Sequence, residues 1–282
     1  MNQAIYYPNI RQAIWLLILF AGFQAVLQVI VEGLNIPSKG HLSSGAVISL
    51  IAAGLIIKMY FKKTNAKFKD VFPLSPIKIS LLLPMTLIIL GANILLSELD
   101  NLTRSLLPAP EWLMANFHNL TTGQTSVWGS LALLVVSAPL TEEFLFRGLI
   151  LSGFLGNYSV KKAVLASAVL FALIHLNPWQ FLGGFIVGVL FAWWFIKTGS
   201  LLPCLFGHAL INAMPMIVYK VLQLEIPGYS SGVSELLFQP LWFDSLGILL
   251  AGVGIWLLIR MFRRVETGCT AGLNEASAAG EP

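Results

Sequence analysis

An apolar segment that carries three ionisable side chains constrains this chain more than any other feature. Residues 128–155 are long enough to cross a bilayer as a helix, yet their middle holds Glu142, Glu143 and Arg147. Each such side chain costs about 2.5–3.5 kcal/mol at the centre of a membrane helix. A helix that keeps three of them therefore needs partners for these charges or a chemical task for them.

The composition indicates that the whole chain is a membrane protein. Of the 282 residues, 57% are hydrophobic and 11% are charged, and the mean hydropathy is +0.81. A soluble domain carries about 25% charged residues. We therefore expect an all-α fold, a polytopic membrane helix bundle of about eight transmembrane helices. The predicted spans lie near residues 12–32, 44–61, 79–98, 127–153, 161–176, 179–197, 201–222 and 244–262.

The basic residues occupy alternate connections between these spans. Lys and Arg cluster before the first span, after the second, fourth and sixth spans, and after the eighth. Eight crossings place all of these clusters on one side, which the positive-inside rule assigns to the cytoplasm together with both termini. The net charge of +4 then follows from membrane topology, and we expect no nucleic-acid partner.

The chain divides into four parts along its length. Residues 1–126 hold the first transmembrane helices and an outer loop, and residues 127–222 hold the intramembrane polar side chains. Residues 223–264 form a second outer loop and the last transmembrane helix. Residues 265–282 are small and polar, which predicts a disordered tail.

Individual small residues and cysteines carry more limited predictions. Gly184 and Gly188 have the spacing that permits close contact between membrane helices, and Pro139 is predicted to kink the fourth span. The two cysteines, Cys204 and Cys269, are too few for a disulfide framework or a structural zinc site.

Four polar side chains are predicted to lie at one depth in the membrane. At 1.5 Å per residue from the cytoplasmic ends of their helices, Glu142, His175, His208 and Asn212 lie about 12–21 Å from the same face. His208 and Asn212 are four residues apart, so they share one helical face. We expect these side chains to meet in one plane within the bilayer.

The two adjacent glutamates are predicted to have different roles. Glu143 and Arg147 are also four residues apart, in the order that favours an ion pair. Glu142 points about 100° away around the same helix. We expect the Glu143–Arg147 pair to make the helix tolerable in the membrane, which leaves Glu142 to face a cavity. A purely structural ion pair is the plainer alternative.

This set of side chains matches the needs of amide hydrolysis. The reaction requires a base that activates water and donors that hold the oxyanion. Glu142 is the candidate base, His175 the residue that orients the water, and His208 with Asn212 the donors. One glutamate and two histidines also make a zinc site with an open position, so the residues alone leave Glu142, His175 and His208 as alternative zinc ligands.

Three short motifs resemble a known family. Residues 142–147 read EEFLFR and match the motif E-E-x-x-x-R, residues 171–175 match F-x-x-x-H, and residues 208–212 match H-x-x-x-N. In this order and on apolar helices, they resemble the CAAX prenyl endopeptidase and bacteriocin-processing family, also called the CPBP or Abi family. The resemblance covers roughly residues 128–218, so residues 127–222 are interpreted as the catalytic core.

The resemblance implies roles for individual residues. In the family the first glutamate and the histidine of the second motif activate water, which are the roles of Glu142 and His175 here. The histidine and asparagine of the third motif form the oxyanion hole, which implies this role for His208 and Asn212. Supporting or substrate-positioning roles fall to Glu143, Arg147 and Phe171.

The function expected on these grounds is an intramembrane endopeptidase without a cofactor. Its partners would be the lipid bilayer and a membrane-associated peptide or protein substrate, either a prenylated CAAX-type protein or a leader peptide. A bacterial inner membrane is the expected location. The alternatives are a zinc-dependent version of the same protease, a non-catalytic scaffold or bacteriocin-immunity protein, and a proton-coupled transporter.

Overall fold

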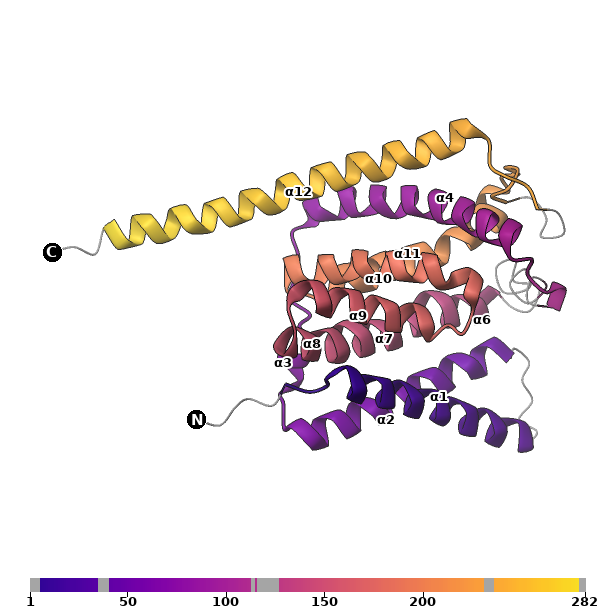
Figure 1. The fold of residues 1–282 in the computed structure, drawn as a ribbon, viewed down its shortest axis with the longest axis horizontal. Coiled ribbons are helices and arrows are strands. Elements are labelled where there is room, and N and C mark those ends of the chain that lie inside the picture. The colour runs from indigo at the N-terminus through magenta and orange to yellow at the C-terminus, as the bar shows by residue number, and fades with distance from the viewer. Residues whose placement is uncertain (1–5, 35–40, 113–114, 116–126, 231–235, 279–282) are drawn as a thin grey trace.

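The computed structural model of the chain is a bundle of helices (Figure 1). It describes residues 6–34, 41–112, 115, 127–230 and 236–278. All regular structure in these ranges is helical. Seven of these helices are long and apolar enough to cross a membrane. The predicted fold, an all-α polytopic bundle, is confirmed.

The N-terminal half contributes the helices before the predicted core. They are α1 (Ile10–Gly33), α2 (His41–Thr64), the short α3 (Phe68–Val71), the 3₁₀ turn η1 (Ile79–Leu81) and α4 (Leu82–Leu106).

The fourth span is continuous but irregular. It runs through α6 (Val127–Ser130), the π-helical η2 (Leu131–Ser137), α7 (Ala138–Glu143), the π-helical η3 (Phe144–Leu151) and α8 (Ser152–Asn157).

The remaining helices follow with short connections. They are α9 (Val160–Leu173), α10 (Pro178–Thr198), α11 (Leu202–Met216), the π-helical η4 (Ile217–Leu222) and α12 (Leu241–Ala278).

The fifth predicted span is the 14-residue helix α9. At 1.5 Å per residue it is about 21 Å long, shorter than a bilayer core of about 30 Å. It packs tightly on α10, because a Cβ on Gly188 would lie 2.9 Å from the Cα of Ala168, and one on Gly184 would lie 3.3 Å from the Cα of Ala172. The predicted close packing at these glycines is confirmed.

The helices alternate in direction across the bundle. The start of α1, the end of α12 and the α2–α3, α8–α9 and α10–α11 connections lie on one side, at the left of Figure 1. The α6 end of the fourth span lies on the other side. This arrangement agrees with the predicted alternation, in which the basic connections share one face of the membrane.

Two helices extend beyond their predicted ends. α4 continues to Leu106 rather than ending near residue 98, because polar side chains stabilise the extra turns; Arg104 and Asp100 form an i,i+4 ion pair at 2.8 Å. α12 is helical through Ala278, where a disordered tail was predicted from residue 265. Most of the outer loop expected before residue 127 lies outside the described residues.

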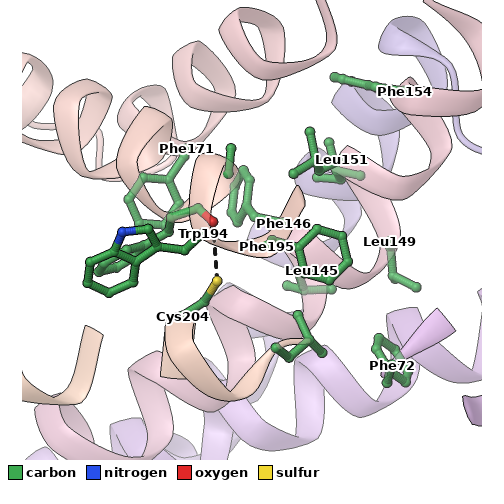
Figure 2. Close-up of a cluster of buried hydrophobic side chains, with 14 of the residues drawn as sticks. Phe72, Leu145, Phe146, Leu149, Leu151, Phe154, Phe171, Trp194, Phe195 and Cys204 are labelled. Carbon is green, nitrogen blue, oxygen red and sulfur yellow. Dashed lines mark hydrogen bonds between the residues drawn. The ribbon is translucent and has the colours of Figure 1, made fainter. Parts of the chain in front are cut away.

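The hydrophobic core surrounds the inner part of the fourth span. Side chains from η3 and α8 pack against aromatic residues of α9 and α10 and against Phe72 (Figure 2). Cys204 on α11 is buried there, and its Sγ donates to the carbonyl of Phe191 at 3.2 Å. This contact joins α11 to α10.

The contact between α4 and α12 depends on glycine. A Cβ on Gly91 would lie 2.5 Å from the backbone nitrogen of Ala251 and from the carbonyl oxygen of Gly247. We predict that Gly91→Ala lowers the free energy of unfolding by about 1–3 kcal/mol, because neither backbone atom can move aside freely. Gly22→Ala is the matched control, since a Cβ there meets nothing within 4 Å. Equal thermal midpoints of the two variants in detergent would contradict this account of the packing.

Candidate active site

The backbone is irregular just before the acidic pair. Ala138 donates its N–H to the carbonyl of Leu133, which is π-helical spacing. The next residue, Pro139, has no N–H to donate. The carbonyl of Leu134 therefore lacks both the α-helical and the π-helical partner, and a polar side chain must satisfy it. π-helical turns of this kind occur frequently at functional sites.

Glu143 is the centre of a buried polar network. Its Oε1 accepts a hydrogen bond from Arg147 Nη1 at 3.1 Å and lies 2.6 Å from His208 Nδ1. The side chain of Glu143 is 0% exposed and that of Arg147 is 1% exposed. The predicted Glu143–Arg147 ion pair is confirmed. The contact with His208 was not predicted, although the common depth of these residues was a signal for it.

The Arg147 guanidinium is held by neighbouring helices as well. Its Nη2 donates to the carbonyl of Gly188 on α10 at 3.2 Å. Its Cζ lies 4.5 Å from the ring centroid of Phe171 and 5.3 Å from that of Phe191. Such cation–π contacts stabilise a cation most where water is excluded. The charge that is costly in a membrane is thus compensated within the bundle.

His175 lies just after α9 rather than inside a span. Its Nδ1 lies 2.8 Å from the carbonyl oxygen of Phe171, one of the last carbonyls of α9, which a helix leaves without backbone partners. Leu176 follows in the left-handed region at φ 48° and turns the chain toward α10. Phe171 also places its ring against both imidazoles, 5.3 Å from His175 and 6.0 Å from His208 between centroids.

Glu142 lies between the two histidines. Its Oε2 is 3.9 Å from the Nε2 of His175 and 3.9 Å from the Nε2 of His208. The Glu142 side chain is 21% exposed, yet Oε2 itself is buried and has no hydrogen-bond partner among the described residues. The structure therefore brings together three of the four candidate catalytic residues.

The contacts of the two histidines determine which nitrogen carries the proton. The Phe171 carbonyl can only accept, and the Glu143 carboxylate is already paired with Arg147, so we assign the hydrogen of each neutral imidazole to Nδ1. Each Nε2 then presents a lone pair toward Glu142. Three acceptors meet at this point, and separations of 3.9 Å are too long for direct hydrogen bonds but suit a bridging water.

Asn212 has a structural contact in addition to its predicted role. Its Nδ2 donates to the carbonyl of Leu134 at 2.8 Å, the carbonyl that Pro139 leaves without a backbone partner. An amide nitrogen carries two hydrogens, so one remains for a second acceptor. Within the described residues Asn212 thus joins α11 to the fourth span, and the sequence offered no signal for this contact.

Glu142, His175 and His208 are also the alternative zinc ligands. Bonds of about 2.1 Å in a tetrahedral zinc site place ligand atoms about 3.4 Å apart. Glu142 Oε2 is 3.9 Å from each imidazole nitrogen, which is wider. Among the described residues no group of three His, Cys, Asp or Glu side chains is arranged to hold a metal ion.

Comparison with known proteins identifies the segment that carries the site. Residues 124–214 match the family described as type II CAAX prenyl endopeptidase Rce1-like. The resemblance carried by the three motifs is thereby confirmed. The Rce1-like match indicates a CAAX protease-type peptidase and an integral membrane protein. No curated protein and no solved structure matches the chain.

The same substitution at the two glutamates should affect stability to very different extents. Glu143→Gln leaves the buried Arg147 without its counter-charge, and loss of one partner of a buried ion pair costs about 3–5 kcal/mol. We predict a large fall in the thermal midpoint for Glu143→Gln. Glu142→Gln is the matched control and should change the midpoint little, since Oε2 of Glu142 makes no hydrogen bond to the described residues. Equal midpoints would show that Glu143 does not stabilise the bundle.

Proposed function

We propose that this protein is an intramembrane endopeptidase that hydrolyses a peptide bond with a water activated by Glu142. One observation carries the proposal: Glu142 Oε2 is buried without a hydrogen-bond partner among the described residues and lies 3.9 Å from two imidazole nitrogens. The match of residues 124–214 to the Rce1-like CAAX prenyl endopeptidases supports the reaction class.

The first step is attack of water on the scissile carbonyl. The water sits between Glu142 and His175, whose Nε2 accepts one of its hydrogens. Glu142 removes the other proton as the water oxygen bonds to the carbonyl carbon, and the carbonyl electron pair moves to its oxygen. General base catalysis of this kind contributes about 10²–10⁴ in rate.

His208, neutral in the resting protein, takes up a proton from solvent on Nε2 as the substrate binds. In this doubly protonated form it stabilises the oxyanion, and the proton returns to solvent when the products leave. Its Nδ1–H is held by Glu143, so Nε2 can donate a hydrogen bond only when the ring is an imidazolium. The buried Glu143 carboxylate at 2.6 Å stabilises this cation. The second amide hydrogen of Asn212 is the proposed further donor. Preorganised donors of this kind are worth several kcal/mol at the transition state.

The second step expels the amine. Glu142, now protonated, gives its proton to the leaving nitrogen as the carbon–nitrogen bond breaks and the oxyanion electrons re-form the carbonyl. The products are a carboxylic acid and an amine, so one water has been added across the peptide bond. Glu142 returns to its carboxylate form for the next cycle.

The proposed substrate is a membrane-associated peptide or protein, of the prenylated CAAX type or a leader peptide. The site is built from helices of a membrane bundle, so a substrate anchored in the bilayer reaches it most directly. We propose a bacterial cell membrane as the location and the bilayer as the surroundings. Glu143, Arg147 and Phe171 are buried, so the role proposed for them is supporting: they hold the catalytic side chains in place.

Cleavage of fluorogenic peptides by the purified protein in detergent tests the proposal. The panel should contain prenylated and unmodified peptides. We predict that Glu142→Gln and His175→Ala each lower kcat by about 10²–10⁴-fold, because they remove the base and the group that orients its water. Glu225→Gln is the matched control, an exposed acid outside the candidate site. Equal activity of Glu142→Gln and wild type would refute the assigned base.

A chelator distinguishes the metal-free scheme from its zinc alternative. We predict that cleavage is unchanged by chelation, because the Glu142–histidine separations are too wide for tetrahedral zinc. Loss of activity that zinc alone restores would assign Glu142, His175 and His208 as ligands instead. No cleavage of any peptide by folded protein would contradict the protease and favour a scaffold, an immunity protein or a proton-coupled transporter.

A further inference from the structure

A second proline leaves a second carbonyl without its partner, one residue from Asn212. Pro215 lies inside α11 and has no N–H, so the carbonyl of Ile211 cannot make its i,i+4 bond. An asparagine from a neighbouring helix supplies the missing donor: Asn93 Nδ2 on α4 lies 3.5 Å from Ile211 O. The arrangement repeats that at Pro139, where Asn212 meets Leu134.

The two asparagine contacts are connected in series. Asn93 joins α4 to α11 at Ile211, and the adjacent Asn212 joins α11 to the fourth span at Leu134. His208, one turn earlier on α11, is bonded to Glu143 on the fourth span. The segment of α11 that bears both proposed oxyanion donors is thus held on two sides.

The outer loop holds Asn93 in turn. The hydroxyl of Tyr229, in the connection between η4 and α12, donates to Asn93 Oδ1 at 2.5 Å. Burial raises the pKa of Tyr229 to about 12, with a smaller contribution from Tyr219, so the hydroxyl keeps its proton at physiological pH. This bond orients the Asn93 amide so that Nδ2 faces α11.

We propose that Asn93, oriented by Tyr229, is a positioning residue for the active site and acts through α11. It satisfies the carbonyl that Pro215 exposes and so holds Asn212 and His208 in register with Glu142. The predicted change in kcat rests on the proposed protease function, whereas the effect of Asn93 on the position of α11 does not. A residue that positions the oxyanion donors should change kcat and leave KM unchanged, since the donors bind the transition state more tightly than the substrate.

Asn93→Leu removes the donor and keeps a side chain of similar size. We predict that kcat falls about 10–100-fold with KM unchanged, because small displacements of a catalytic group have effects of this size. Tyr229→Phe, which removes only the hydroxyl, should lower kcat in the same direction by less. Thr103→Val is the control: Thr103 is also on α4, but its hydroxyl donates within the same helix, to Leu99 O at 2.7 Å. A KM effect alone, or an equal fall in kcat for the control, would overturn the proposal.

Restoring the backbone donor gives the sharpest test. Pro215→Ala returns an N–H that can reach Ile211 O, so the double variant Asn93→Leu with Pro215→Ala should recover most of the kcat lost in Asn93→Leu alone. A purely structural defect at position 93 would not be repaired by a change in α11. Failure of the double variant to recover would contradict the proposed route through Ile211.

Hydrogen exchange separates this inference from the proposed function. The backbone amides of residues 208–214 and 216 should exchange faster in Asn93→Leu than in wild type and return toward the wild-type rate in the double variant. This measurement needs no substrate. If wild type cleaves no peptide, the protease proposal fails while exchange still decides whether Asn93 holds α11. Unchanged exchange in Asn93→Leu would overturn the positioning role.

Discussion

The carboxylate of Glu143 is the interaction on which the rest of the structure depends. A fully buried negative charge is tolerated only when it is paired and hydrogen-bonded, and one oxygen of Glu143 meets both Arg147 and His208. These partners bring in the other helices, since His208 lies on α11 and Arg147 binds the Gly188 carbonyl on α10. The need to compensate the charge of Glu143 therefore fixes the fourth span, α10 and α11 relative to one another.

The active-site geometry follows from this compensation. Because Glu143 occupies His208 Nδ1, the opposite nitrogen of the ring is directed toward Glu142. The Phe171 carbonyl does the same for His175 at the end of α9. Two imidazoles with fixed orientations then flank a carboxylate that has no structural bond at Oε2 among the described residues. Glu143 thus stabilises the bundle, and the adjacent Glu142 is left for the proposed chemistry.

Outside the Glu143 network, two prolines determine where the bundle requires polar side chains. Pro139 and Pro215 each leave a carbonyl unpaired within a membrane helix, where an unsatisfied polar group costs several kcal/mol. Asn212 and Asn93 meet these carbonyls from neighbouring helices. The irregular backbone that results is concentrated near the site, in keeping with the tolerance of broken helices where their backbone is buried within the protein.

Much of the site could be predicted from the chain because its chemistry is local. The i,i+4 spacing of Glu143 and Arg147 predicted their ion pair, and counting residues from the helix ends placed Glu142, His175 and His208 at one depth. The contacts between helices could not be predicted, because they depend on rotation of one helix against another. The Glu143–His208 bond and the Asn212–Leu134 bond are of this kind, and the second also requires π-helical spacing. The helical extent of α4 and α12 beyond the predicted spans shows that apolar composition marks the membrane-spanning part of a helix but not its ends.

The protonation of His208 tests the central claim most directly. Nitrogen-15 magnetic resonance of histidine-labelled protein in detergent reports which ring nitrogen carries the hydrogen, and the chain contains only four histidines to assign. We predict that the neutral His208 ring carries its proton on Nδ1, where it donates to Glu143, and that Nε2 carries none. Substitution Glu143→Gln should remove that preference if the variant folds. A His208 protonated on Nε2 alone in the wild-type protein would contradict the arrangement on which the proposed mechanism is built.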